Sequence, residues 1–145
     1  MTYSVYYCTC ANLIKSGLPK DIFCFCFFTL QWNLISGLES TDSISLNNLW
    51  WEDDHIKIFF PRYKSDQAGL TSKEPRHIYS NPFNLTFCPV RALARYLISF
   101  QLVLGSKNGL LFPDLYQKKR FGQSLHSVLK RHSAIGVIPK RFGYS

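Results

Sequence analysis

Hydrophobic residues are densest in the first third of the chain, where they predict a helix that is buried on most sides. Residues 21–36 contain the run Ile22–Leu30, which is apolar apart from one threonine. Asp21 is a suitable N-cap, and Gly37 lies where a glycine commonly ends a helix. The run is too short to span a membrane, which takes about 20 apolar residues, so a core helix is predicted.

The first 20 residues show no clear hydrophobic period, and Gly17 and Pro19 interrupt them. We therefore expect residues 1–20 to form an N-terminal extension outside the core, and we assign residues 21–145 to the domain. After the first helix, a short helical turn is expected to begin at Ser40 or Thr41.

The middle of the chain predicts a small antiparallel sheet of three strands. Residues 46–52 lead into an acidic turn at 53–54, and residues 55–63 are rich in the β-branched and aromatic side chains that strands favour. A polar loop at 64–75 separates them from a short returning strand at 76–79.

Helical spacing returns in the last third of the chain. Residues 89–103 are amphipathic, and Pro89 suits the first turn of a helix. Residues 121–132 predict another helix whose inward residues are Phe121, Leu125, Val128 and Leu129. One helix, a small sheet and further helices together predict an α+β fold.

Composition supports a folded chain and adds a charge asymmetry. The 145 residues are 46% hydrophobic, enough for one domain or part of a larger one. Residues 1–60 carry three basic and six acidic side chains, whereas residues 61–145 carry 14 and three, so the halves have charges of −3 and +11. A basic half indicates a polyanionic partner, first nucleic acid and second an anionic membrane surface, and the alternative is a solvated basic face.

The odd count of five cysteines argues against a secreted disulfide framework. Two Cys-x-Cys pairs are spaced too closely for a typical zinc site, so no metal is assigned. Cys24 and Cys26 lie inside the apolar run and are expected to be small buried hydrophobes. Without a recognisable targeting segment, we expect an intracellular protein with reduced thiols and no membrane association.

Several basic residues are candidates for phosphate contacts. Lys64 lies at the mouth of the predicted hairpin, and Lys118–Arg120 immediately precede a predicted helix, where anions are favoured. The complete set of DNA-binding candidates is Lys64, Arg76, Arg91, Arg95, Lys118, Lys119, Arg120 and Lys140. For each of them a solvated surface charge is the alternative interpretation.

The order of short motifs along the chain resembles one known family. The motifs are Phe28–Ile35, Glu39–Thr41, Trp51 with Asp53–Asp54, Phe59–Phe60 with Lys64–Gln67 and Gly69, Pro75–Pro82, Cys88–Pro89 with Ala92–Leu93, Leu111–Pro113, Ile135–Gly136, and Arg141 with Gly143. Together they resemble the catalytic domain of the tyrosine recombinases (phage-integrase-like), closest to those of eukaryotic crypton-type mobile elements. The resemblance runs from about residue 21 to the end, and 64–82 is its most specific part.

The resemblance implies a mainly helical α+β catalytic domain with one three-stranded antiparallel sheet, its C-terminal helices missing. The family cleaves and rejoins double-stranded DNA through a 3′-phosphotyrosine, with two arginines on the scissile phosphate and a hairpin lysine as general acid. It needs no cofactor and assembles as homo-oligomers on DNA. A eukaryotic member is expected in the nucleus.

The family's site residues are only partly present. Lys64 falls at the hairpin lysine and Arg141 at the second arginine, whereas Gly37 and Ile138 occupy the places of the first arginine and the histidine. Tyr144 is too close to Arg141 to be the nucleophile, which lies further along in the family. Because a lost phosphate clamp costs about 10²–10³ in rate, strand cleavage by this chain is not expected.

The hypothesis is therefore a DNA-binding remnant of a tyrosine recombinase that is catalytically inactive. One alternative is a domesticated DNA-binding module or a decayed sequence without function, and another is a fragment of an active recombinase. If the closing helices are missing, apolar side chains of residues 121–138 are expected to be uncovered.

Overall fold

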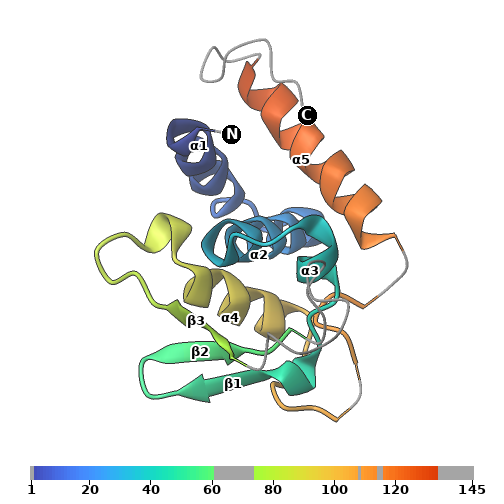
Figure 1. Ribbon diagram of the computed structural model, residues 1–145. Coiled ribbons are helices and arrows are strands. Elements are labelled where there is room, and N and C mark those ends of the chain that lie inside the picture. Colours follow the sequence, from blue (N-terminus) through green and yellow to red (C-terminus); the bar gives the residue numbers. More distant parts are fainter. Residues whose placement is uncertain (1, 61–73, 108, 114–115, 134–145) are drawn as a thin grey trace.

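The computed structural model describes residues 2–60, 74–107, 109–113 and 116–133, and within them it shows helices packed on one side of a small sheet (Figure 1). The α-helices are α1 (Tyr3–Leu13), α2 (Pro19–Leu34), α3 (Leu38–Asp42), α4 (Pro89–Ser99) and α5 (Gln117–Ser133). The strands are β1 (Leu49–Glu52), β2 (His55–Ile58) and β3 (Arg76–Tyr79), and the 3-10 turns are η1 (Leu46–Asn48) and η2 (Leu85–Phe87). The predicted α+β class is confirmed.

Helix α2 is the centre of the core, as its hydrophobic run predicts. It contacts α1, α3, α4, α5 and β3, and every side chain from Asp21 to Leu30 is buried. A helix that is apolar on all faces gains most when other elements surround it completely. The other elements are therefore arranged around α2.

The predicted caps of α2 are wrong. The helix begins at Pro19, whose fixed φ suits a first turn, with Leu18 as its N-cap. Asp21 instead lies inside the first turn, where its carboxylate accepts a hydrogen bond from Ser16 Oγ at 2.6 Å. At the other end, Ile35 rather than Gly37 takes the left-handed conformation, with φ 49°, and its N–H bonds back to the last turn.

Helix α1 belongs to the core, so the expectation of an extension outside the core is wrong. Val5, Tyr6, Cys10 and Leu13 are buried, and the Tyr6 ring stacks on Trp32 at 4.3 Å between centroids. The buried stripe does have helical spacing, but one of its members is a polar threonine. Thr9 is fully buried, and its burial is tolerated because its Oγ1 donates a hydrogen bond to Val5 O at 2.7 Å.

The three-stranded antiparallel sheet is confirmed, with strand order β1-β2-β3. The acidic turn lies between β1 and β2, and Asp53 there has a positive φ of 50°, which Asp tolerates. β3 has the predicted bounds, whereas β2 ends at Ile58, earlier than expected. The sheet's inner face buries Leu49, Ile56, Ile58 and Ile78.

Helices α4 and α5 confirm two predictions and correct two others. Pro89 stands in the first turn of α4, which ends at Ser99, before the expected residue 103. The four predicted inward residues of α5 are buried, none being more than 8% exposed. The expected uncovered apolar surface is therefore absent from the described part of α5, because α1 and α2 pack against this helix.

The cysteines behave as small hydrophobes, as predicted for Cys24 and Cys26, which are fully buried. Burial raises the pKa of the Cys10 thiol to about 12 and that of Cys26 well above its ordinary value. Such thiols stay protonated at neutral pH and are poor nucleophiles. Within the described ranges, no helix is both long and apolar enough to cross a membrane.

Candidate nucleic-acid interface

Helix α5 carries the densest positive charge in the described part of the chain. Its 17 residues include five lysines and arginines and no acidic residue. Lys118, Lys119, Lys130 and Arg131 are exposed, while the apolar residues of the helix face the core. We call these four residues together the basic face of α5, of which Lys119 and Lys130 lie on the same side of the helix.

The exposed polar residues of α5 form a stripe along the helix. Lys119, Gln123, His126 and Lys130 are exposed and recur every three or four residues, so they lie on one side of it. The stripe is about 16 Å long at 1.5 Å per residue. Gly122 adjoins it, and a Cβ there would meet no other atom within 4 Å, so the helix surface is low and open at that point.

Aromatic contacts fix the position of α5 on the core. The Phe121 ring stacks on Phe27 at 4.6 Å, with an angle of 28° between the planes. The Arg120 guanidinium lies 4.3 Å from the centroid of the Phe23 ring. Arg120, one of the predicted phosphate contacts, is thus half-buried and packs against the core.

An ion pair near the C-terminal end of α5 adds to this attachment. Arg131 Nη2 lies 3.5 Å from Oδ1 of the buried Asp21 in α2. Near the other end, burial raises the pKa of the Asp42 carboxyl, and the positive charge of Lys118 opposes that rise. The Arg131–Asp21 pair thus links α5 to the central helix α2.

Arg95, one of the predicted DNA contacts, has a structural role. Its Nη1 donates to Ile14 O at 2.7 Å, and its Nη2 donates to Ser16 O. Both carbonyls follow the end of α1, so the guanidinium ties the α1–α2 connection to α4. Arg91 is exposed one turn earlier on α4 and remains available for a ligand.

Replacing Arg95 with alanine is expected to lower the free energy of unfolding by about 2–3 kcal/mol, because two charge-assisted hydrogen bonds are lost. Arg91→Ala is the matched control and should change it by less than about 0.5 kcal/mol. Urea denaturation followed by circular dichroism measures both values. Equal effects of the two substitutions would contradict the role given to Arg95.

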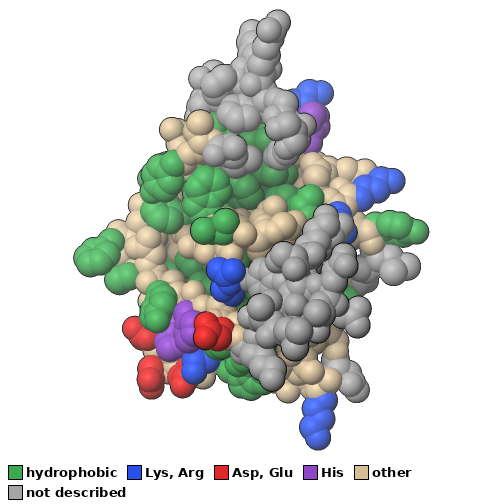
Figure 2. Space-filling model, in the orientation of Figure 1, with side chains coloured by type: hydrophobic (Ala, Val, Ile, Leu, Met, Phe, Trp, Pro, Cys, Tyr) green, Lys and Arg blue, Asp and Glu red, His purple; other side chains and the backbone are tan. Residues whose placement is uncertain are grey.

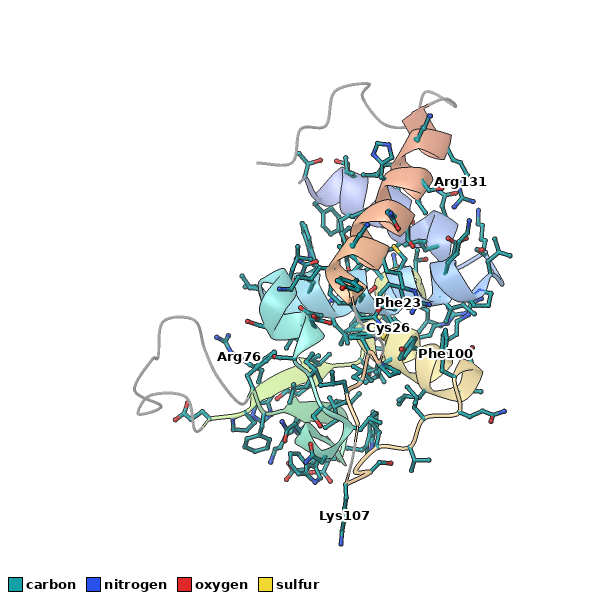
Figure 3. All side chains as sticks on the ribbon, turned by 90° about the vertical axis from the view of Figure 1, so that its right-hand side faces the viewer. Phe23, Cys26, Arg76, Phe100, Lys107 and Arg131 are labelled. Atoms are coloured by element: carbon teal, nitrogen blue, oxygen red, sulfur yellow. The ribbon has the colours of Figure 1, made fainter. Side chains whose placement is uncertain are left out.

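The remaining predicted contacts are not gathered into one patch. Arg76 is exposed on β3, and lysine and arginine side chains are scattered over the face that Figure 2 shows. Figure 3 places Arg76, Lys107 and Arg131 in separate parts of the molecule. Lys64, Ile138, Lys140 and Arg141 lie outside the described residues. In the described part, the basic face of α5 is thus the strongest candidate.

Gly37 lies in the connection between α2 and α3, where the resemblance expects an arginine. A Cβ at Gly37 would meet no atom within 4 Å, and its φ is not in the left-handed range. Nothing in the local packing therefore demands a glycine. A residue with a β-carbon therefore fits at this position without strain in the backbone.

Sequence reasoning singled out Lys118–Arg120 but placed them just before a helix at 121–132, whereas they lie in the first turn of α5, which begins at Gln117. It missed Gln123, His126, Lys130 and Arg131, which belong to the same surface. The signal was present, because the chain has no acidic residue between Asp114 and its end. No family model, curated protein or solved structure matches this chain. The family resemblance therefore stays a prediction.

Proposed function

We propose that this chain binds double-stranded DNA through the basic face of α5, as a non-catalytic remnant of a tyrosine-recombinase-type domain. The observation that carries the proposal is an amphipathic helix with five basic residues and no acidic one, four of them exposed. Lysine and arginine that neutralise phosphates release condensed counterions, which drives DNA binding and makes it salt-dependent.

The shape of α5 suits a duplex. The B-DNA major groove is about 12 Å wide and admits one α-helix. Lys119 and Lys130 stand at the two ends of the exposed stripe, where they reach phosphates, and Gln123 and His126 lie between them. The open surface at Gly122 allows the helix backbone to approach the DNA closely.

Binding is favoured over cleavage because of Gly37 and Ile138. These positions hold an arginine and a histidine in the family that the chain resembles, and each lost phosphate clamp costs about 10²–10³ in rate. The buried core and the charge-paired attachment of α5 favour a folded binding module over a decayed sequence. An intracellular, DNA-containing compartment follows from the proposal.

Fluorescence anisotropy with a labelled 20-base-pair duplex tests the proposal, with salt varied between 50 and 200 mM. The double variant Lys119→Gln/Lys130→Gln should reduce the slope of log K against log salt by about 1.8, because about 0.9 is lost per phosphate contact. Its affinity at low salt should fall at least about tenfold.

The matched control is Lys15→Gln/Lys20→Gln, which removes the same charge from exposed positions around the start of α2. This control should retain most of the wild-type slope and affinity. Absence of salt-sensitive binding in the wild type, or equal losses in the two double variants, would overturn the proposal.

A further inference from the structure

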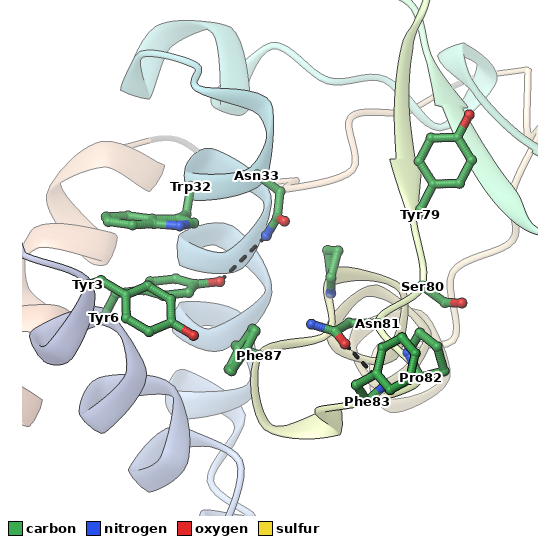
Figure 4. Close-up of a pocket in the computed structure, with 11 residues that line it drawn as sticks. Tyr3, Tyr6, Trp32, Asn33, Tyr79, Ser80, Asn81, Pro82, Phe83 and Phe87 are labelled. Carbon is green, nitrogen blue, oxygen red and sulfur yellow. Dashed lines mark hydrogen bonds between the residues drawn. The ribbon is translucent and has the colours of Figure 1, made fainter.

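An aromatic hollow of about 390 Å³ opens between α1, the end of α2 and the segment that follows β3 (Figure 4). Six aromatic side chains line it: Tyr3, Tyr6, Trp32, Tyr79, Phe83 and Phe87. Figure 4 places Tyr3, Tyr6 and Trp32 on one side and Tyr79 and Phe83 on the other. Its volume lies in the range of small-ligand sites, about 300–1,000 Å³.

The rings of the hollow divide into fixed and exposed ones. Tyr6 and Trp32 are stacked with 10° between their planes, and Tyr3 meets Phe87 edge-on at 6.0 Å. Three rings are exposed at the rim, where Tyr3 is 58%, Tyr79 56% and Phe83 99% exposed. A fully exposed phenylalanine beside a prearranged aromatic wall leaves a ring surface available for stacking.

Two amide groups give the hollow a donor and an acceptor. Asn33 Nδ2 donates to Thr29 O at 2.8 Å, and Asn81 Oδ1 accepts from the Phe83 N–H at 3.2 Å. Within the described residues, Asn33 Oδ1 and Asn81 Nδ2 have no hydrogen-bond partner. The lining contains no charged residue, so a phosphate finds no counter-charge there.

We propose that this hollow binds an unpaired nucleobase, which is a neutral, planar ring with donors and acceptors on its edge. Single-stranded bases are recognised by stacking on aromatic side chains and by hydrogen bonds to their edges. The alternative ligand for an aromatic groove is a proline-rich segment. Such a segment offers chiefly carbonyl acceptors, so it would provide no donor for Asn33 Oδ1. The choice of a nucleobase rests on the proposed DNA-binding function.

The lining of the hollow includes no residue of α5, so the two activities are separable by substitution. Phosphate contacts at α5 weaken with salt, whereas stacking of a neutral ring does not. Loss of one stacking partner typically lowers the affinity for a base about 5- to 100-fold.

The test titrates neutral nucleosides into the full chain at 0.5 M salt and follows tryptophan fluorescence, since Trp32 lines the hollow. We expect saturable quenching that weakens about tenfold in Phe83→Ala. Tyr116→Ala is its control, because Tyr116 is 78% exposed and lies outside the hollow.

A second pair of variants tests the hydrogen bonds. Asn81→Asp keeps the oxygen that accepts from the Phe83 N–H but removes the unpartnered donor, so nucleoside binding should weaken. Asn47→Asp makes the same charge change at an exposed position of η1 and should bind as the wild type does.

Three outcomes would overturn this inference: no saturable quenching by any nucleoside, equal quenching in Phe83→Ala and the wild type, or quenching by a polyproline peptide alone. The duplex titration in low salt gives an independent measure of the proposed function. A paired duplex that binds while nucleosides do not would remove the nucleobase site and leave duplex binding intact.

Discussion

Replacing Tyr6 with alanine is expected to lower the free energy of unfolding by about 3–5 kcal/mol, the range for large aromatic residues in a core. The Tyr6 side chain is 1% exposed, and its ring contacts Trp32 at 4.3 Å and Phe28 at 5.1 Å. Alanine would leave a cavity between α1 and α2 that neighbouring rings cannot fill without losing their own contacts.

Urea denaturation monitored by circular dichroism measures this loss, with Tyr7→Ala as the matched control. Tyr7 is the next residue of α1 but is 39% exposed, so its truncation should cost less than about 1 kcal/mol. If the two variants were equally stable, α1 would not be part of the core. Tyr6→Phe should cost much less than Tyr6→Ala, because it keeps the ring and loses only the hydroxyl, which lies 3.5 Å from Asn33 Nδ2.

The hydrophobic pattern was sufficient to predict α2, the sheet and the inner face of α5. In each of these elements the buried positions are occupied mainly by apolar residues, so they can be recognised in the sequence. The pattern failed to predict that α1 is part of the core. The buried residues of α1 include Thr9 and Cys10 and do not form a run of aliphatic side chains. Thr9 is buried at no cost in hydrogen bonding because it bonds the backbone of its own helix. The period of such a stripe is visible only once threonine is counted as an inward residue.

Tertiary contacts decided which basic residues face solvent. Arg95 and Arg91 are indistinguishable by spacing, yet the two carbonyls that bind Arg95 lie 79 and 81 residues away in the sequence. Arg120 belongs to the run Lys118–Arg120, but the Phe23 ring holds it against the core. The aromatic hollow is formed by residues of α1, α2, β3 and η2, which are far apart in the sequence, so no local motif predicts it.

Replacing Phe27 with alanine is expected to destabilise the protein by about 3–5 kcal/mol. Phe27 is fully buried, and its ring centroid lies 5.0 Å from that of Phe112 and 4.6 Å from that of Phe121 in α5. The ring also contacts Phe23, so one truncation weakens three packing contacts. Phe83→Ala makes the same chemical change at a 99% exposed position and should alter stability by less than about 0.5 kcal/mol.

A double-mutant cycle resolves how much of this loss comes from α5. Phe27→Ala and Phe121→Ala remove the same stacked pair, so their combined cost should fall short of the sum by about 0.5–1.5 kcal/mol. A fully additive cycle would contradict direct packing of the two rings.

The Phe27→Ala variant also distinguishes two contributions to the proposed DNA binding: the charge of α5 and the docking of α5 on the core. It leaves every lysine and arginine of α5 unchanged, so the salt dependence of duplex binding should keep its wild-type slope. The affinity should nevertheless fall in proportion to the fraction of molecules in which α5 is docked on the core. A reduced slope in this variant would mean that Phe27 alters which phosphates are contacted. An unchanged affinity, in a variant destabilised as predicted, would mean that DNA binding does not require α5 to be held against α2.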